Sequence, residues 1–159
     1  MTALAWNDEL VLQQPHIDAD HEEFVRLLNA LADAAAAADG EGALPAFDAL
    51  HAHVQAHFAR EEGFMAATGF SADNCHTKQH RMVLDLMRDV RSCAVERQEW
   101  EPMRHLAPAL AEWLPQHADM MDAALVFTMK NLGFDPDHPT PVAPAPAEAD
   151  AGCGSVGCN

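Results

Sequence analysis

The segment HAHVQAHFAREEGFM (residues 51–65) has helical spacing, but polar side chains interrupt the apolar stripe that this spacing creates. Steps of three and four residues connect Phe47, Leu50, Val54, His57, Glu61 and Phe64. Residues at such steps share one face of a helix, and the apolar face packs into a core. A buried imidazole and a buried carboxylate are costly unless a partner compensates them. The stripe therefore predicts a polar site inside the protein.

Three other helical segments also place histidine on an otherwise apolar stripe. The stripes are Ile17, His21, Phe24, Leu28 and Leu31; His76, His80, Val83, Met87 and Val90; and Leu106, Leu110, Trp113, His117, Met120, Ala124 and Phe127. Asp122 follows His117 by five residues, which is roughly 140° around a helix. We therefore expect Asp122 on the flank of its helix, from where it reaches inward at an angle.

The sequence predicts an all-α protein with four helices joined by short loops. Helix-forming Ala, Leu, Met, Glu and Gln dominate, and long runs of Val, Ile and Thr are missing. The expected helices run from about Asp18 to Asp39, Pro45 to Thr68–Gly69, Ser71 to Gln98 and Pro102 to Gly133. Asp73 is expected in the first turn of the third helix. Short loops imply antiparallel neighbours, so we expect an up-down-up-down four-helix bundle. Pro108 and Pro115 fall inside the fourth helix and are expected to bend it.

Segments of different composition flank this helical region. Residues 1–17 read as an N-terminal arm with Trp6 and Leu10 as anchors, so the bundle domain spans residues 1–134. Residues 135–159 are rich in Pro, Ala and Gly, which predicts an extended, flexible C-terminal tail. The tail carries Cys153 and Cys158 as a Cys-x4-Cys pair. This pair is open to four interpretations: a disulfide, a metal ligand, a contact for a redox partner, or no role.

Charge and cysteine content limit the partners and the compartment. The formal net charge of −16 argues against nucleic acid and against insertion into an anionic membrane. The N-terminus has neither a basic start nor a long apolar run, so we expect no signal peptide and a cytoplasmic protein. Cys75 and Cys93 stand alone on helical segments, and we expect them to be reduced thiols.

The polar residues of the four stripes, together with Asp122, form a candidate set of metal ligands. The set is His21, His57, Glu61, His76, His80, His117 and Asp122, while His16, His51, His53, His105 and His138 are interpreted as ordinary core or surface histidines. Imidazole with carboxylate suits iron, zinc, copper or manganese. The set exceeds the needs of one ion. Two six-coordinate ions that share both carboxylates and a solvent oxygen would keep one open position, where a small exogenous ligand could bind.

Four motifs together resemble the hemerythrins, in particular the single-domain bacterial hemerythrins. They are IDADH (17–21), HFAREE (57–62), HTKQH (76–80) and WLPQHADMMD (113–122), and the resemblance runs from Trp6 to about Leu132. It implies reversible O2 binding at two non-haem iron ions, Fe2+ or Fe3+, with an oxo or hydroxo bridge. It further implies that His76, His80 and His117 hold one iron, that His21 and His57 hold the other, and that Glu61 and Asp122 bridge them.

Given this resemblance, the leading hypothesis is an O2 carrier, store or delivery protein. We do not expect an enzyme. A dry apolar pocket would favour reversible binding, and its expected wall is Phe24, Phe58, Trp113 and Met120. The alternatives are a di-iron peroxidase or oxidase, a nitric oxide-handling protein, an O2 or redox sensor, and an iron store. Di-iron oxygenases in helical bundles use Glu-x-x-His motifs, and EEGF and ERQE supply none. A redox or O2-accepting protein partner is expected but not identified.

Overall fold

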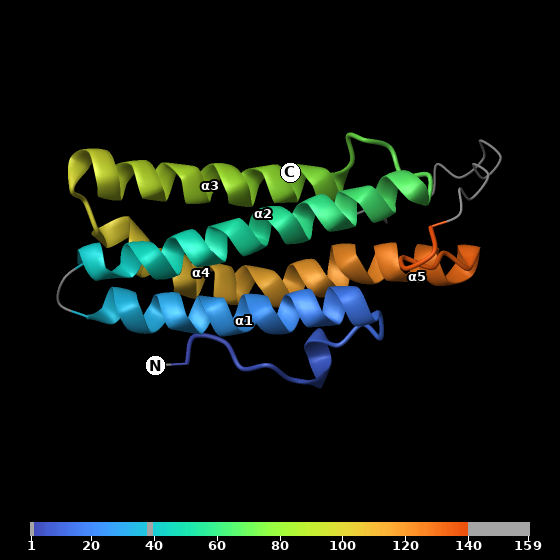
Figure 1. Cartoon of the computed structure of the whole chain (residues 1–159), viewed down its shortest axis with the longest axis horizontal. Helices are drawn as coiled ribbons and strands as arrows, with labels where there is room; N and C mark the ends of the chain where they lie inside the picture. Colours follow the sequence, from blue (N-terminus) through green and yellow to red (C-terminus); the bar gives the residue numbers. More distant parts are fainter. Residues whose placement is uncertain (1, 38–39, 140–159) are drawn as a thin grey trace.

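The structure, a computed structural model, describes residues 2–37 and 40–139. These residues contain helices and no strand (Figure 1). The elements are η1 (Asp8–Leu10), α1 (Pro15–Ala36), η2 (Gly40–Ala43), α2 (Leu44–Ala67), α3 (Cys75–Arg97), α4 (Glu101–His117), the π-helical segment η3 (Ala118–Asp122) and α5 (Ala123–Leu132). The segments α4, η3 and α5 follow one another without a break, so they replace the single fourth helix that was expected.

The long helices lie side by side as a helical bundle (Figure 1). Helix α1 contacts α2 and α4, and helix α3 contacts the same two neighbours. Each helix therefore presents one face to a shared interior, and the prediction of an all-α bundle is confirmed. The stripes of α1, α2 and α3 point into this interior, because most of their apolar members are buried. The fourth stripe does so only as far as His117. Beyond it Met120, Ala124 and Phe127 are exposed, so the expected stripe is wrong for these three residues.

Two helix starts differ from expectation because side chains cap them. Helix α1 begins at Pro15, three residues before the predicted Asp18, and the Gln14 side chain accepts a hydrogen bond from the Ile17 amide at 2.9 Å. Helix α3 begins only at Cys75, because Asn74 and Thr77 form a capping box. Asp73 therefore precedes the helix, and its expected place in the first turn is wrong. Helix α1 also ends earlier than expected, at Ala36.

The prolines of the fourth segment do not end its helix. Pro108 and Pro115 both lie inside α4. Pro115 has no amide proton, so the hydrogen bond that would close its own helical turn is missing. The helix widens soon afterwards, where the Ala123 amide donates to the Ala118 carbonyl across five residues. The fourth segment thus departs from the regular α-helix by one π-helical turn, while the bend expected at the prolines stays a prediction.

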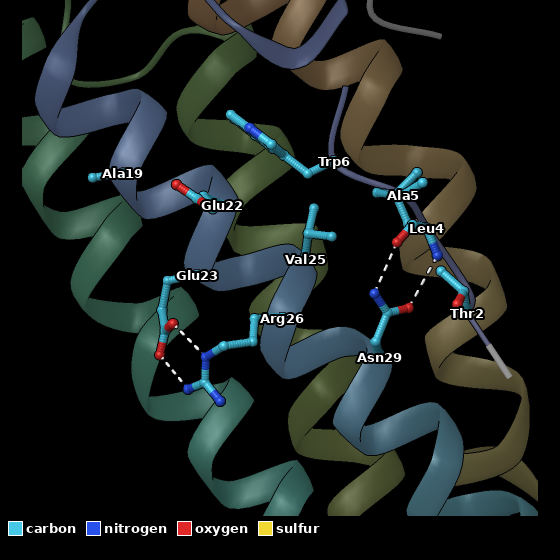
Figure 2. A pocket seen from close by; sticks show the side chains of 10 residues that line it. All are labelled: Thr2, Leu4, Ala5, Trp6, Ala19, Glu22, Glu23, Val25, Arg26 and Asn29. Atoms are coloured by element: carbon cyan, nitrogen blue, oxygen red, sulfur yellow. Dashed lines mark hydrogen bonds and ion pairs between the residues drawn. The ribbon is translucent and has the colours of Figure 1, made fainter. Parts of the chain in front are cut away.

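One side chain of α1 that the sequence did not single out helps to fasten the N-terminal arm. The Asn29 carboxamide accepts from the Ala3 amide at 2.7 Å. It also accepts from the Leu4 amide at 3.1 Å and donates to the Leu4 carbonyl at 2.8 Å (Figure 2). Of the two predicted anchors, Leu10 is buried and Trp6 is half-buried. A cleft of about 510 Å³ lies between the arm and α1. None of the residues that line it belongs to the predicted site.

The apolar core of the bundle consists of two clusters. The larger contains Phe24, Phe47, Phe58 and their neighbours, and the smaller contains Ile17, Met65, Leu125, Val126 and Met129. On α1, His21 falls between Ile17 of the smaller cluster and Phe24 of the larger one. The buried polar residues therefore occupy the part of the interior between two apolar clusters.

The two cysteines of the described chain differ in state. Cys75 is disulfide-bonded, so the expectation of a reduced thiol is wrong there, whereas Cys93 is free. Cys153, Cys158 and most of the predicted tail lie outside the described residues. Within the described part, no helix combines the length and the apolarity that crossing a membrane requires.

Candidate metal centre

Seven polar side chains meet between the two apolar clusters, and each long helix contributes at least one of them. They are His21 on α1, His57 and Glu61 on α2, His76 and His80 on α3, His117 at the end of α4, and Asp122 at the end of η3. Each of the seven residues is at most 2% exposed. The structure thus brings together all of the residues that the sequence proposed as ligands.

The two carboxylates divide their oxygens between two groups of histidines. On one side, His21 Nε2 lies 3.1 Å from Asp122 Oδ2, and His57 Nε2 lies 3.7 Å from Glu61 Oε1. On the other side, His76 Nε2 lies 3.0 Å from Asp122 Oδ1 and 3.4 Å from Glu61 Oε2. His80 Nε2 lies 3.2 Å from Glu61 Oε2. His117 Nε2 lies 3.1 Å from Asp122 Oδ1. Each carboxylate therefore faces both groups at once.

These close approaches do not satisfy the groups as hydrogen bonds. In the described chain, ten buried side-chain nitrogen and oxygen atoms lack a hydrogen-bond partner, and all of them belong to the seven residues. They include the Nε2 atom of every one of the five histidines and all four carboxylate oxygens. Buried polar atoms are normally paired, and a site that binds an ion is one standard reason for exceptions. Adjacent ligands on one octahedral ion are about 3 Å apart, which matches these contacts.

Two sets of ligand atoms are compact enough to surround an ion each. One set comes from Glu61, His76, His80, His117 and Asp122, and the other comes from His21, His57 and Glu61. Within each set the ligand atoms lie within 4.8 Å of one another. Glu61 belongs to both sets, as a bridging carboxylate requires. The donor set of imidazole and carboxylate fits a first-row transition metal.

The π-helical segment brings Asp122 to the same face as His117. In a regular α-helix a spacing of five residues would leave the two side chains roughly 140° apart. Segment η3 spans Ala118–Asp122, so the whole spacing lies within the wider turn, which has about 4.4 residues. Asp122 is fully buried with both oxygens among the histidines. The expectation that Asp122 lies on the flank is therefore wrong.

Three of the imidazoles are held from outside by residues that sequence reasoning did not propose. His57 Nδ1 lies 3.3 Å from Asp20 Oδ2, His80 Nδ1 lies 3.2 Å from Glu62 Oε1, and His117 Nδ1 lies 2.7 Å from Gln79 Oε1. These oxygens only accept, so each Nδ1 carries the proton and each Nε2 offers its lone pair inward. Each outer residue directly precedes or follows a proposed ligand in the sequence, and this adjacency was the signal that could have revealed them.

Charges inside the centre shift the pKa values of its members in opposite directions. Burial raises the pKa of Glu61, but His57, His76 and His80 outweigh it and lower this pKa to about 2. His117, His21 and His76 hold the pKa of Asp122 well below its usual value despite burial. Burial works against protonation of His76, yet Asp122 and Glu61 raise its pKa to about 9. Both carboxylates are therefore ionised at neutral pH, while His76 keeps a proton that an incoming cation must displace.

Aromatic rings stack on two histidines of the group His76, His80 and His117. Phe58 stacks on His80 with 3.8 Å between ring centroids, and Trp113 stacks on His117 with 4.2 Å. Phe24 and Phe58 are buried, and Trp113 is half-buried. The fourth residue of the expected pocket wall is placed differently, because Met120 is 47% exposed. The structure does not bring Met120 together with the other three.

The five remaining histidines lie outside the cluster. His16, His51 and His53 are half-buried, and His105 and His138 are exposed. His16 pairs with Asp137 at 2.9 Å, and His53 stacks on the His57 ring with 6.2 Å between centroids. Among the described residues, these histidines do not join a group able to hold a metal ion.

Comparisons with known proteins agree with the geometry. The family described as "Hemerythrin HHE cation binding domain" matches residues 14–126. A bacteriohemerythrin of Ralstonia nicotianae is 37% identical over 135 residues, which cover 85% of this chain and 95% of that protein. A bacteriohemerythrin of Aquifex aeolicus is 30% identical over 118 residues, covering 74% of this chain and 88% of that protein. No solved structure matches the chain.

Proposed function

This chain belongs to the hemerythrin family, and from that premise we propose that its buried cluster holds two iron ions and binds O2 reversibly. One observation carries the proposal above all others. Glu61 and Asp122 each direct one oxygen toward His21 or His57 and the other toward the histidines of α3 and α4. A carboxylate between two groups of unpaired imidazoles is what a bridged pair of ions requires.

The ligands divide unequally between the two ions in this proposal. His76, His80 and His117 would hold one iron, His21 and His57 would hold the other, and both carboxylates would bridge, with an oxo or hydroxo group as a third bridge. The side of the centre with His21 and His57 would supply fewer protein ligands, and O2 would bind there. When bound, the iron pair supplies the reversible redox chemistry that O2 binding needs.

The protein's own contribution is to keep the surroundings of the centre apolar and free of proton donors. Phe58 stacks on His80, Trp113 stacks on His117, and Phe24 is buried one helical turn after His21. An apolar, dry environment disfavours the release of charged oxygen species, so O2 leaves unchanged. We therefore keep Phe24, Phe58 and Trp113 in the proposed pocket wall and omit the exposed Met120.

Further parts of the proposal concern the whole chain. The helices would follow one another in an up-down-up-down order, which the chain's reversals between successive helices in Figure 1 support. The protein would act in the cytoplasm as a carrier, store or delivery module, and a redox or O2-accepting protein would be its partner. The net charge of −16 favours a partner with a basic surface.

The test is a cycle of oxygenation on iron-loaded protein. The protein is reduced without air, exposed to O2 and then flushed with inert gas, while its visible spectrum and iron content are followed. We expect about two iron ions per chain and an absorption band that appears with O2 and disappears without it over several cycles. Irreversible oxidation or continuous consumption of reductant would instead identify a di-iron enzyme. A folded protein that takes up no iron, or only one ion, would contradict the proposed centre.

A further inference from the structure

Asp20 differs from the other two residues that hold an imidazole from outside the cluster. Its Oδ2 atom contacts His57 Nδ1 at 3.3 Å and also accepts a hydrogen bond from the Arg60 guanidinium. The Asp20 side chain is 13% exposed, whereas the Glu62 side chain beside His80 is 45% exposed. Gln79, which holds His117, carries no charge. Asp20 is thus the most shielded anion next to a proposed ligand outside the bridging carboxylates.

The position of Asp20 is fixed by more than one contact. Its backbone carbonyl accepts a hydrogen bond from His53 Nε2 at 2.8 Å, so α2 holds both ends of the residue. Arg60 lies three residues after His57 on the same helix, and it therefore reaches Asp20 from the neighbouring turn. The carboxylate, the guanidinium and the imidazole form a linked chain between solvent and the centre, because Arg60 is 41% exposed and His57 is 1% exposed.

We propose that Asp20 and Arg60 act as positioning residues for His57, with opposite electrostatic effects on its ring. Through His57 they set the iron affinity and the reduction potential on the His21–His57 side of the centre. This inference rests on the proposed function only in that the cluster must hold iron. A carboxylate that accepts the Nδ1–H bond makes the other ring nitrogen a stronger donor and favours the more highly charged metal. The guanidinium on the same oxygen draws charge away and weakens this effect.

A purely structural explanation makes a different prediction. If Asp20 and Arg60 only tied α1 to α2, the loss of either partner would disturb the centre in the same way. The proposed electrostatic role requires opposite effects, because Asp20 adds negative charge to the His57 ring and Arg60 offsets it. The direction of change in two single variants therefore separates the two explanations.

The experiment compares Asp20→Asn with Arg60→Gln in the full-length, iron-loaded chain. The control is Glu23→Gln, which breaks the exposed Glu23–Arg26 pair on the same helix as Asp20. Iron affinity and the midpoint potential of the centre are measured for each variant. We expect Asp20→Asn to weaken iron binding about 10-fold and to raise the potential. We expect Arg60→Gln to lower the potential, and Glu23→Gln to leave both quantities unchanged. Shifts of the potential in the same direction, or no shift, would overturn the proposal.

A second measurement does not depend on iron or on O2. Nitrogen NMR of the iron-free chain reports which ring nitrogen of His57 carries the proton. We expect Nδ1–H in the wild type and a mixture of tautomers in Asp20→Ala, because the acceptor is then lost. An unchanged tautomer in that variant would overturn the positioning role. Opposite potential shifts in a protein that fails to bind O2 reversibly would contradict the O2 function and leave this inference standing.

Discussion

At the scale of single residues, Glu61 and Glu62 are neighbours with the same side chain and very different surroundings. Glu61 is fully buried, and its two oxygens face two groups of histidines. The Glu62 side chain is 45% exposed and accepts a hydrogen bond from His80 Nδ1 at 3.2 Å. One step along a helix turns a residue by about 100°, which is enough to separate the two environments.

This contrast yields a matched pair of variants. Glu61→Gln replaces one carboxylate oxygen by an NH2 group, which cannot coordinate a cation, so the bridge between the ions is lost. We expect its iron content to fall to about one ion per chain or less. Glu62→Gln keeps an oxygen that can accept from His80, and the charge it removes is 45% exposed to solvent, so we expect this variant still to hold about two iron ions per chain. Iron analysis of both purified variants checks this, and full iron content in Glu61→Gln would refute the bridging role.

The proton on His76 predicts how metal uptake depends on pH. In the chain without metal the pKa of His76 is raised to about 9, above its usual 6.5, so the imidazole is protonated between these values and must lose its proton to bind. The apparent affinity for a divalent ion should therefore rise about tenfold per pH unit in this window and stop rising, for this proton, near pH 9. Calorimetry with Zn2+ in buffers of different ionisation enthalpy counts the released protons. An affinity independent of pH from 6.5 to 9 would contradict the shift.

At the scale of elements, the π-helical segment decides where the last proposed ligand points. Segment η3 adds one residue to the turn between His117 and Asp122 and keeps both on the inner face. It also carries α5 onward in a phase that buries Leu125, Val126 and Met129. A single widened turn thus accommodates an extra residue without rotating the helix that follows it.

Two single-residue deletions test this function of η3. Removing the exposed Asp119 should convert the π turn to an α turn. His117 and Asp122 would then be separated by four residues, and residues four apart share one face of an α-helix. We expect cooperative unfolding with a modest loss of stability. Removing the exposed Glu112 from α4 should rotate Leu114 and His117 away from the interior by about 100° and cost upwards of about 3 kcal/mol. Denaturant unfolding measures the stability of both variants. Equal losses of stability would show that η3 does not accommodate the removal of a residue.

At the scale of the whole molecule, the proposed centre lies between two apolar clusters that share no buried residue. The unpaired atoms of the seven residues sit where the clusters would otherwise join. A metal that binds only the folded chain adds its binding free energy to stability. The interior of this bundle is therefore incomplete as an apolar core, and the proposed ions would compensate its polar centre.

Removal of the metal should consequently destabilise the entire bundle. We expect chelation of the reduced protein to lower Tm, with a loss of about 3 kcal/mol relative to protein in free iron at 100 times the dissociation constant. Added Fe2+ should restore Tm in the wild type and restore it less in Glu61→Gln. Thermal scans followed by circular dichroism measure this. A Tm that does not respond to chelator, in protein shown to have lost its iron, would mean that the polar centre needs no compensation.

Much of the bundle could be predicted from the sequence, because helical periodicity is a local property. The steps of three and four residues placed His21, His57, Glu61, His76, His80 and His117 on buried faces, and all are buried. Helix ends were less predictable where a cap overrides composition, as with Gln14 before α1 and Asn74 before α3. Met120 occupies a stripe position by regular α-helical spacing, but the π turn changes the phase and leaves it exposed.

By itself, the sequence determined which chemical groups enter the interior and the family to which the chain belongs, because both depend on residue identity and local spacing. Only the tertiary structure decided how those groups meet. The turn of Asp122 toward the histidines depends on one widened helical turn, and the split of each carboxylate between two histidine groups depends on four helices together. The contacts from Asp20 to His57, Glu62 to His80 and Gln79 to His117 each join two different helices. No spacing within one helix encodes such contacts, because they arise from how neighbouring helices are rotated against each other.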